Sequence, residues 1–418
     1  MDVPRGADAA AVNVYFHTFG CKANQYDTEL VRQAFADAGA TVVDEPAAAD
    51  LAVVNSCTVT HESESKLRRY VRHQGRAGRD TVVMGCAAAL DRGELAALPR
   101  VRAVVGGADP VQVLRAAGYA QPRVAPGLRR FSAGARGWLK IQDGCDEHCT
   151  FCATTLARGV NRSRPVAAIV AEARALAEHH AELVLTGVHI GTYGRDNGVV
   201  SGEWDVSSLG KLLERLVEAV PSVRFRLSSI EATEVDDRIA RLLIEAPRHV
   251  AAHVHAPLQS AANPVLKRMG RHWYTAETYR ARIEWLAERL PVFGLGADVI
   301  AGFPGETDLQ HRATVDFITA LPFTYLHVFP FSVRPDAAAA RLPGQVPDAI
   351  VRERAAELRG LGDTKAAAYR GGRQGGRADA VICGRQDGRL EALTQDYLTV
   401  YLSSDAWDGR PRLDLTVT

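Results

Sequence analysis

Short apolar runs alternate with longer amphipathic segments through the first 120 residues of the chain. The runs are VNVYF from Val12, LAVVN from Leu51 and TVVMG from Thr81. Between the first two, apolar residues recur at helical spacing, with Asp27 placed to cap the start of a helix and Gly39 its end. Buried strands that alternate with helices are typical of a parallel sheet covered on both faces. We therefore expect residues 1–120 to form an α/β domain with an open parallel sheet.

A stretch rich in glycine, proline and alanine, GYAQPRVAPGLRRFSAGARG, interrupts this pattern. We place a linker at residues 121–130 and the start of a second domain at Phe131. From there the strand candidates ELVLTG, VRFRLSS, GADVIAG and YLHVFPF alternate with helical stretches such as 166–179 and 276–290. Repeated strand–helix units predict a full or partial (βα) barrel over residues 131–362.

The last part of the chain, residues 363–418, has a different pattern. A basic helical stretch leads into the strand-like pieces ADAVICG, YLTVYLSS and RLDLTVT. Three short strands without intervening helices predict a small β-module.

Composition narrows the class of protein only slightly. The chain has 418 residues, 47% of them hydrophobic, which is ample for two or three domains, and its 50 basic and 49 acidic residues neither require nor exclude a polyanionic partner. No apolar stretch is long enough to span a membrane, and the first residues do not have the pattern of a secretory signal, so we expect a cytoplasmic protein. Seven cysteines in a reducing compartment point to metal or redox chemistry.

Three of these cysteines lie in one short loop, GCDEHCTFC, directly after a predicted strand. Cys145, Cys149 and Cys152 are separated by three and then two residues. Three thiolates at this spacing can bind three irons of a [4Fe-4S] cluster and leave the fourth iron open to a substrate. A zinc loop is the alternative, but structural zinc sites prefer four ligands in paired spacings.

Three other cysteines each lie just past the end of a predicted strand. They are Cys21, Cys57 and Cys86. In an open parallel sheet the carboxyl ends of the strands lie at one edge, so these thiols can meet at one point and hold a second three-thiolate cluster. The spacing alone supports three separately buried cysteines equally well, because free cysteine is often a core residue.

The motifs around these cysteines are similar to those of a known family. FGCKANQYDTE, NSCTVT and GCAAA, with GCDEHCTFC and ARGVNRSRP, resemble the radical S-adenosylmethionine methylthiotransferases over residues 12–365. Within that family the first of these motifs, together with LTGVHIGTYG and HVFPFS, is most similar to the branch that acts on threonylcarbamoyladenosine beside the anticodon of transfer RNA. The resemblance implies a flavodoxin-like first domain, a partial radical S-adenosylmethionine (SAM) barrel and a C-terminal module similar to a degenerate TRAM domain.

The resemblance also implies cofactors and a reaction. Two [4Fe-4S] clusters and SAM would be present, with SAM serving both as methyl donor and as the source of a 5′-deoxyadenosyl radical. The cluster of Cys21, Cys57 and Cys86 would carry the sulfur to be methylated, and no catalytic residue is expected beyond the cluster ligands. A radical cofactor suits this chemistry because an unactivated C–H has neither a leaving group nor an acidic proton.

Polar residues near the ends of the predicted barrel strands are candidates for binding SAM. An isolated turn after a strand is more often only a turn, but these residues follow the cysteine loop in the expected order. Histidines near the same strand ends, among them His189, His255 and His327, are candidates for a ligand or proton-transfer role, although buried structural histidines are the commoner case. The SAM candidates are Thr186, Gly187, Ser228, Glu231 and Asp298.

Basic clusters supply the only sequence signal for a nucleic acid. The stretch from Lys66 to Arg79 carries six Lys or Arg and no acid. A solvated helix face explains such a cluster as well as a phosphate contact does. We predict transfer RNA and an electron donor such as flavodoxin or ferredoxin as partners of a monomer, without a membrane. The candidate RNA contacts are Lys66, Arg69, Arg158, Arg162 and Arg164.

Other functions remain compatible with the sequence. A methylthiotransferase could act on a peptide, a protein or a small molecule instead of RNA, and the second cluster could serve only electron transfer. A non-catalytic RNA-binding descendant is disfavoured because all six cysteines are present.

Overall fold

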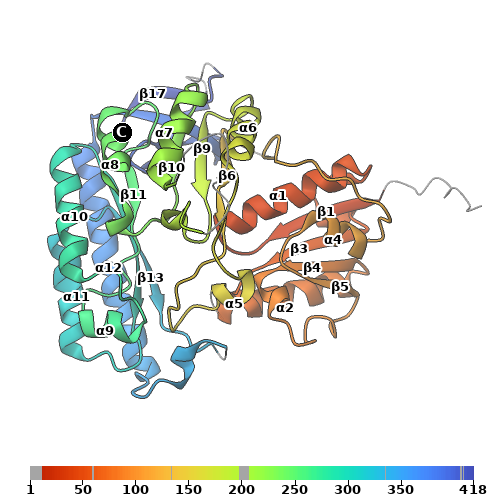
Figure 1. Ribbon diagram of the computed structural model, residues 1–418, viewed down its shortest axis with the longest axis horizontal. Helices are drawn as coiled ribbons and strands as arrows, with labels where there is room; N and C mark the ends of the chain where they lie inside the picture. Colours follow the sequence, from red (N-terminus) through yellow and green to blue (C-terminus); the bar gives the residue numbers. More distant parts are fainter. Residues whose placement is uncertain are drawn as a thin grey trace, which may run out of the picture. The chain divides into compact units, whose positions relative to one another are not determined.

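The computed structural model describes residues 12–418 except 59–60, 133, 197–206, 335, 405–406 and 408, and no side-chain description covers His61 and Glu62 (Figure 1). The chain divides into two compact units. The first comprises the residues up to Leu128 together with Ala153–Gly159, and the second comprises Arg129–Cys152 and Val160–Thr418.

The first unit is built on a parallel sheet with the strand order β2-β1-β3-β4-β5. This order is that of flavodoxin-like folds, in which the chain reverses direction across the sheet between β1 and β3. The predicted open parallel sheet is confirmed. The elements are β1 (Asn13–Thr18), α1 (Lys22–Asp37), β2 (Thr41–Val43), η1 (Pro46–Ala48), β3 (Leu51–Ser56), α2 (His61–Arg76), β4 (Asp80–Gly85), α3 (Cys86–Ala89), β5 (Val101–Gly106), α4 (Pro110–Ala116) and α5 (Thr154–Arg158).

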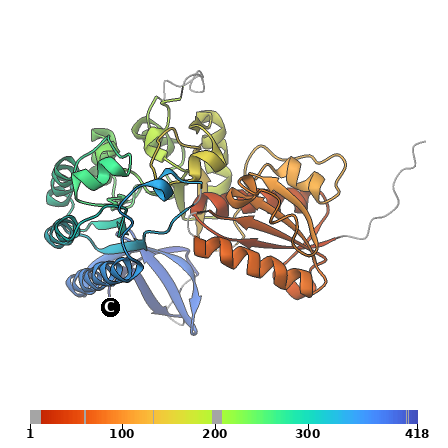
Figure 2. The same cartoon turned by 90° about the horizontal axis from the view of Figure 1, so that it is seen from below.

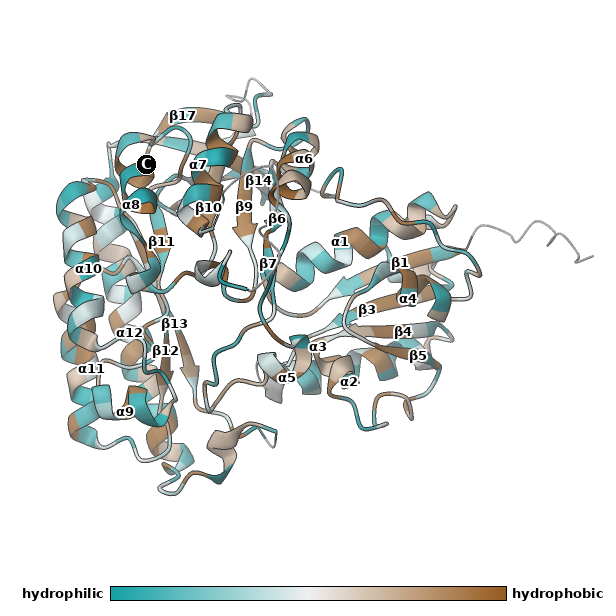
Figure 3. Cartoon of the chain, viewed as in Figure 1, coloured by the Kyte–Doolittle hydropathy of each residue, from teal (hydrophilic) through white to brown (hydrophobic). Residues whose placement is uncertain are grey.

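Helices cover both faces of this sheet, as the apolar runs predict. On one face Val31 and Phe35 of α1 pack with Val53 and Met84 from the strands and Leu114 from α4. On the other face α2 and α3 pack against alternate residues of β3 and β4. The hydropathy colouring shows these central strands as predominantly hydrophobic, in contrast to the mixed helices (Figure 3).

Helix α1 begins earlier than expected. Its first residue is Lys22, with Cys21 at the N-cap, so Asp27 lies inside the helix and does not cap it. Asp27 is 5% exposed and forms an ion pair with Arg158. Because Cys21 occupies the N-cap, the expected capping role of Asp27 is wrong.

The second unit contains a partial barrel of parallel strands. The strand orders are β10-β9-β6 and β11-β12-β13, and the bridges Phe225–Val250 and Ser229–His255 connect the two sets. Helices lie on the outside of the strands (Figure 2). The elements are β6 (Arg136–Lys140), β7 (Gln142–Asp143), β8 (Arg162–Ser163), α6 (Val166–Ala177), β9 (Glu182–Thr186), η2 (Ile190–Thr192), α7 (Leu209–Ala219), β10 (Arg224–Leu227), η3 (Ala232–Glu234), α8 (Asp237–Glu245), β11 (His253–His255), α9 (Asn263–Arg268), α10 (Ala276–Arg289), β12 (Gly294–Ala301), α11 (Asp308–Ala320), β13 (Tyr325–Pro330), η4 (Ala338–Arg341) and α12 (Asp348–Arg373).

An antiparallel sheet ends the chain, in the order β16-β15-β14-β17. Its strands are β14 (Arg377–Gln386), β15 (Arg389–Thr394), β16 (Thr399–Ser403) and β17 (Arg412–Thr416). The predicted β-module is present, but the expected boundary between residues 362 and 363 falls inside α12, which continues to Arg373. Gly360, Gly362 and Asp363 at that point are weak helix formers, but Gly362 packs closely on Leu326 of β13, so tertiary packing carries α12 past the expected boundary and the module begins after it.

Buried arginines attach this sheet to the barrel. Arg224 donates to the carbonyls of Asp379 and Leu393, and Arg226 donates to those of Thr394 and Gln395. Both guanidinium groups also bind Glu182, which is fully buried. The C-terminal sheet therefore shares one buried polar network with β9 and β10.

Among the described helices, none combines the length and apolar character that a membrane crossing requires.

Candidate functional site

The loop that carries Cys145, Cys149 and Cys152 follows β6 and β7. Backbone contacts hold its centre, because Thr150 donates from its amide to the carbonyl of Met269 and from its hydroxyl to that of Arg268. All three cysteines are partly exposed. The predicted ligands thus lie on one loop that the end of α9 fixes in place.

Hydrogen-bond donors are directed at the sulfurs of this loop. The amide of Glu147 lies 3.4 Å from the Cys145 Sγ, and His189 Nδ1 lies 3.7 Å from it. Arg271 Nη1 lies 3.7 Å from the Cys149 Sγ. Such donors stabilise negative charge on sulfur, so the surroundings of the loop fit the thiolate ligands of an iron-sulfur cluster.

The raised pKa of Cys149 agrees with a ligand that a bound metal would ionise. Burial raises the pKa of Cys149 to about 12, with Arg271 acting in the opposite direction. Burial lowers the pKa of His189, but hydrogen bonds to Cys145 and Glu234 outweigh it and raise the pKa to about 10. A bound metal deprotonates cysteine ligands outright.

Glu231, one of the predicted SAM contacts, has an unsatisfied acceptor. Its Oε1 accepts from Arg271, while its Oε2 is buried without a hydrogen-bond partner. Burial raises the pKa of Glu231 although Arg271 opposes that shift. A buried carboxylate oxygen without a donor is costly, so this atom fits an ammonium group such as that of the methionine part of SAM. Ser228, also buried, follows β10 close to this position.

Thr186 and Gly187 lie at the end of β9, where Thr186 is buried. The structure gives a packing reason for the glycine. A Cβ at residue 187 would lie 2.7 Å from Oε1 and 2.8 Å from the carbonyl oxygen of Gln142. The same Oε1 accepts from the amides of Val188 and His189. Gly187 therefore admits Gln142, which connects the cysteine loop to the β9 loop.

Asp298 lies on β12 between two histidines. Its Oδ1 is 3.0 Å from His255 Nε2 and 3.3 Å from His327 Nδ1. Burial raises the pKa of Asp298, but these hydrogen bonds outweigh it and the pKa lies well below its usual range. The Tyr325 hydroxyl extends the chain by binding His255 and His253. His255, Asp298 and His327 could also ligate a cation, since their candidate ligand atoms lie within 4.8 Å of one another.

In the first unit, the loops after β1, β3 and β4 bring Cys21, Cys57 and Cys86 together. The Cys21 and Cys86 sulfurs lie 3.9 and 3.8 Å from the same oxygen, Oδ1 of Asn24. Cys57 packs on Gly20, where a Cβ would lie 2.9 Å from its sulfur and where φ is +114°. This convergence disfavours three separate core positions and fits a three-thiolate site.

Asn24 organises this group. Its Nδ2 donates to the carbonyls of Phe19 and Ser56, each at 2.9 Å, which ties together the loops that carry Cys21 and Cys57. The Asn24 carbonyl in turn accepts from Asn55 of β3. Sequence reasoning did not single out Asn24; its position one turn after Cys21 was the available signal.

The five candidate RNA contacts have different surroundings. Lys66 and Arg69 lie on the exposed face of α2, opposite Leu67 and Val71, and Arg162 is exposed on β8. Arg164 instead donates to Glu172 and to the carbonyl of Lys140.

The expectation of a phosphate contact is wrong for Arg158. Its guanidinium is 9% exposed and donates to Asp27, Asn24 and Cys86. A buried guanidinium with these partners is not available to RNA.

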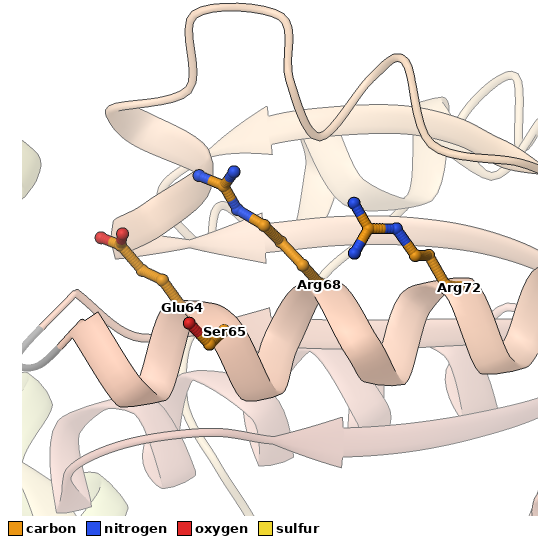
Figure 4. Close-up of a pocket in the computed structure, with 4 residues that line it drawn as sticks. All are labelled: Glu64, Ser65, Arg68 and Arg72. Carbon is orange, nitrogen blue, oxygen red and sulfur yellow. The ribbon is translucent and has the colours of Figure 1, made fainter.

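A surface hollow adjoins the same face of α2. It is lined by Glu64, Ser65, Arg68 and Arg72, with both arginines extending from one side of the helix (Figure 4). Arg68 forms an ion pair with Glu94. Arg69, Arg72 and Arg76 add exposed positive charge on the outer side of α2.

Comparison with protein families finds a match in each of the two units. Residues 139–318 match the radical SAM superfamily, and residues 13–106 match a family described as uncharacterized protein family UPF0004. The barrel of the second unit thus belongs to the radical SAM superfamily, whose members use SAM and a [4Fe-4S] cluster.

Whole-chain relatives narrow the assignment. The chain is 38% identical to the threonylcarbamoyladenosine tRNA methylthiotransferase MtaB of Bacillus subtilis, over 85% of this chain and 81% of the relative. It is 32% identical to the tRNA-2-methylthio-N(6)-dimethylallyladenosine synthase of Clavibacter michiganensis, over 94% and 78%. The chain belongs to the radical SAM methylthiotransferase family, and the resemblance seen in the motifs is confirmed.

A solved structure supports the fold. The radical S-adenosylmethionine methyltransferase TsrM from Kitasatospora setae, with cobalamin and a [4Fe-4S] cluster bound, aligns with a TM-score of 0.57 at 17% identity. The alignment covers 77% of this chain and 76% of TsrM. At this identity the likeness bears on the fold alone.

Proposed function

We propose that this enzyme inserts a methylthio group at C2 of N6-threonylcarbamoyladenosine, next to the anticodon of transfer RNA. The observation that carries the proposal is the presence of two separate groups of three cysteines, one in each unit. The relatives named for this reaction span most of the chain and support the choice of substrate.

In this proposal the second unit generates the radical. Cys145, Cys149 and Cys152 hold the cluster that cleaves SAM, and Arg271 and His189 stabilise the charge on its sulfurs. Glu231 binds the ammonium group of SAM through its unsatisfied Oε2. Thr186, Gly187, Ser228 and Asp298 complete the SAM site at the ends of the barrel strands.

The first unit carries the sulfur to be transferred. Cys21, Cys57 and Cys86 hold the auxiliary [4Fe-4S] cluster, and Asn24 fixes the loops from which they project. When bound, this cluster would supply an iron site for the sulfur that the reaction methylates and transfers. We assign residues 1–120 to this role and residues 121–130 to the linker. We further propose that the enzyme is a cytoplasmic monomer and that flavodoxin or ferredoxin is its electron donor.

Nucleoside analysis tests the substrate. The chain is expressed in a bacterium that lacks its own enzyme for this modification, and transfer RNA is digested and examined by mass spectrometry. We expect 2-methylthio-N6-threonylcarbamoyladenosine to appear. A methylthio product on a peptide or on another nucleoside, with N6-threonylcarbamoyladenosine unchanged, would contradict the proposed substrate.

The exposed arginines of α2 are expected to bind RNA phosphates. Each phosphate contact adds about 0.7 to 0.9 to the magnitude of the negative slope of log association constant against log salt concentration. Replacing Arg69, Arg72 and Arg76 by Gln should therefore weaken transfer RNA binding and lower that slope by about 2 to 3. Fluorescence anisotropy with unmodified transfer RNA at several salt concentrations measures both quantities.

The matched control replaces three arginines of the second unit that are already paired with carboxylates. These are Arg238 and Arg241, which bind Glu214, and Arg280, which binds Glu284. An equal change of slope in the two triple variants would show that only net charge matters and that α2 is not the contact surface.

A further inference from the structure

We propose that Arg158 is a positioning residue for the auxiliary cluster and sets its reduction potential. The inference rests on the proposed function, since it requires Cys86 to be a cluster ligand. It concerns a residue on α5, the helix that directly follows the radical-cluster loop in the chain. The helix nonetheless belongs to the same compact unit as Cys21, Cys57 and Cys86.

The guanidinium of Arg158 is aimed at a ligand sulfur. Its Nε lies 3.2 Å from the Cys86 Sγ, which is within hydrogen-bond distance for an N–H···S contact. Its Nη2 lies 2.5 Å from Oδ1 of Asn24 and 2.8 Å from Oδ2 of Asp27. The guanidinium therefore contacts the proposed ligand Cys86, Asn24 and the carboxylate of Asp27.

Burial makes this arrangement specific. The side chain of Arg158 is 9% exposed and that of Asp27 is 6% exposed. Asp27 lies inside α1 and is held by the helix backbone, so it fixes the direction of the guanidinium. A lysine carries the same charge but lacks the planar fork that reaches Cys86 and Asp27 together.

The chemical effect follows from the charge of the cluster. A [4Fe-4S] cluster with three thiolate ligands is anionic, and reduction adds a further negative charge. A cation and an N–H donor at one sulfur stabilise the reduced form more than the oxidised form, which raises the reduction potential. Arg158 would thereby also offset part of the negative charge of the cluster that carries the sulfur to be transferred.

The experiment isolates the auxiliary cluster in the full-length chain. Cys145, Cys149 and Cys152 are all replaced by Ala, and the protein is reconstituted anaerobically with iron and sulfide. In this background Arg158→Gln is compared with Arg158→Lys and with the control Arg162→Gln. Arg162 is an exposed arginine on β8 that donates to the carbonyl of Val160.

Iron content, the electron paramagnetic resonance spectrum and the midpoint potential are measured, with circular dichroism as the check on folding. For Arg158→Gln we expect a potential lower by at least about 59 mV, a tenfold change in a one-electron equilibrium, and an altered spectrum. Arg158→Lys should recover part of the potential through its charge, and Arg162→Gln should match the parent.

The other outcomes are distinct. Loss of iron in Arg158→Gln with retained fold, and its recovery in Arg158→Lys, would also support a positioning role. An unchanged potential and spectrum in Arg158→Gln, or an equal shift in Arg162→Gln, would overturn the inference while leaving the second cluster in place. A parent that binds no iron would contradict the proposed function itself.

Discussion

Replacing Cys21 by Ala is expected to abolish methylthio transfer while 5′-deoxyadenosine formation continues. Cys21 lies with Cys86 at Asn24 in the first unit, next to Cys57, whereas SAM cleavage is expected to depend on the cysteine loop of the second unit. Loss of one ligand from a three-thiolate site leaves the auxiliary cluster too few anchors, so iron should fall from about eight to about four per chain.

Iron and sulfide content are measured after anaerobic reconstitution. The methylthio product and 5′-deoxyadenosine are quantified by chromatography. The control is Cys383→Ala, because Cys383 lies on β14 in the second unit, where its thiol donates to the carbonyl of Val381. This variant should retain the iron content and both products. Methylthio product from Cys21→Ala would refute the role of Cys21.

The second large effect is expected at Glu182. Its carboxylate binds Arg136, Arg224 and Arg226, and the side chains of Glu182, Arg224 and Arg226 are at most 1% exposed. Glu182→Gln removes the carboxylate that these cations share and leaves Arg224 only a longer contact of 3.4 Å with Asp379, which costs about 3–5 kcal/mol of unfolding free energy. Thermal and urea unfolding at neutral pH measure the loss.

The control for Glu182 is a carboxylate that also binds two arginines but lies at the surface. Glu214 pairs with Arg238 and Arg241, whose side chains are 48% and 53% exposed. Glu214→Gln should cost no more than about 1 kcal/mol. Equal losses in the two variants would mean that the buried network contributes nothing beyond an exposed ion pair.

The carboxylate of Glu182 also predicts that the stability of the fold depends on pH. Burial raises the pKa of Glu182, but the three arginines outweigh it and hold the pKa well below its usual value. A depressed pKa stabilises the fold above the pKa of the unfolded chain, near 4.5, and this contribution is lost as the pH falls through the folded value. The difference in stability between the parent and Glu182→Gln should therefore shrink in acid. A constant difference down to the lowest accessible pH would show that the charge of Glu182 is not the cause.

The sequence by itself determined the class of the protein. The apolar runs and helical periodicity identify the parallel sheet and the barrel because both patterns are local. The spacing of Cys145, Cys149 and Cys152 also lies within one loop, so it could be interpreted without knowledge of the fold. The rule that parallel strands end at one edge allowed the three strand-end cysteines to meet, but it left three separate buried positions equally open until the structure brought them together.

Only the tertiary structure decided which side chains surround these positions. Several contacts join residues far apart in the chain. They are the contact of Arg158 with Cys86, the pairing of Asp27, the attachment of the C-terminal sheet by Arg224 and the place of Asp298 between two histidines. Such contacts depend on strand register and on the packing of helices against the sheet. A sequence pattern specifies neither, so Arg158 was expected at a phosphate, while the structure places it against a sulfur.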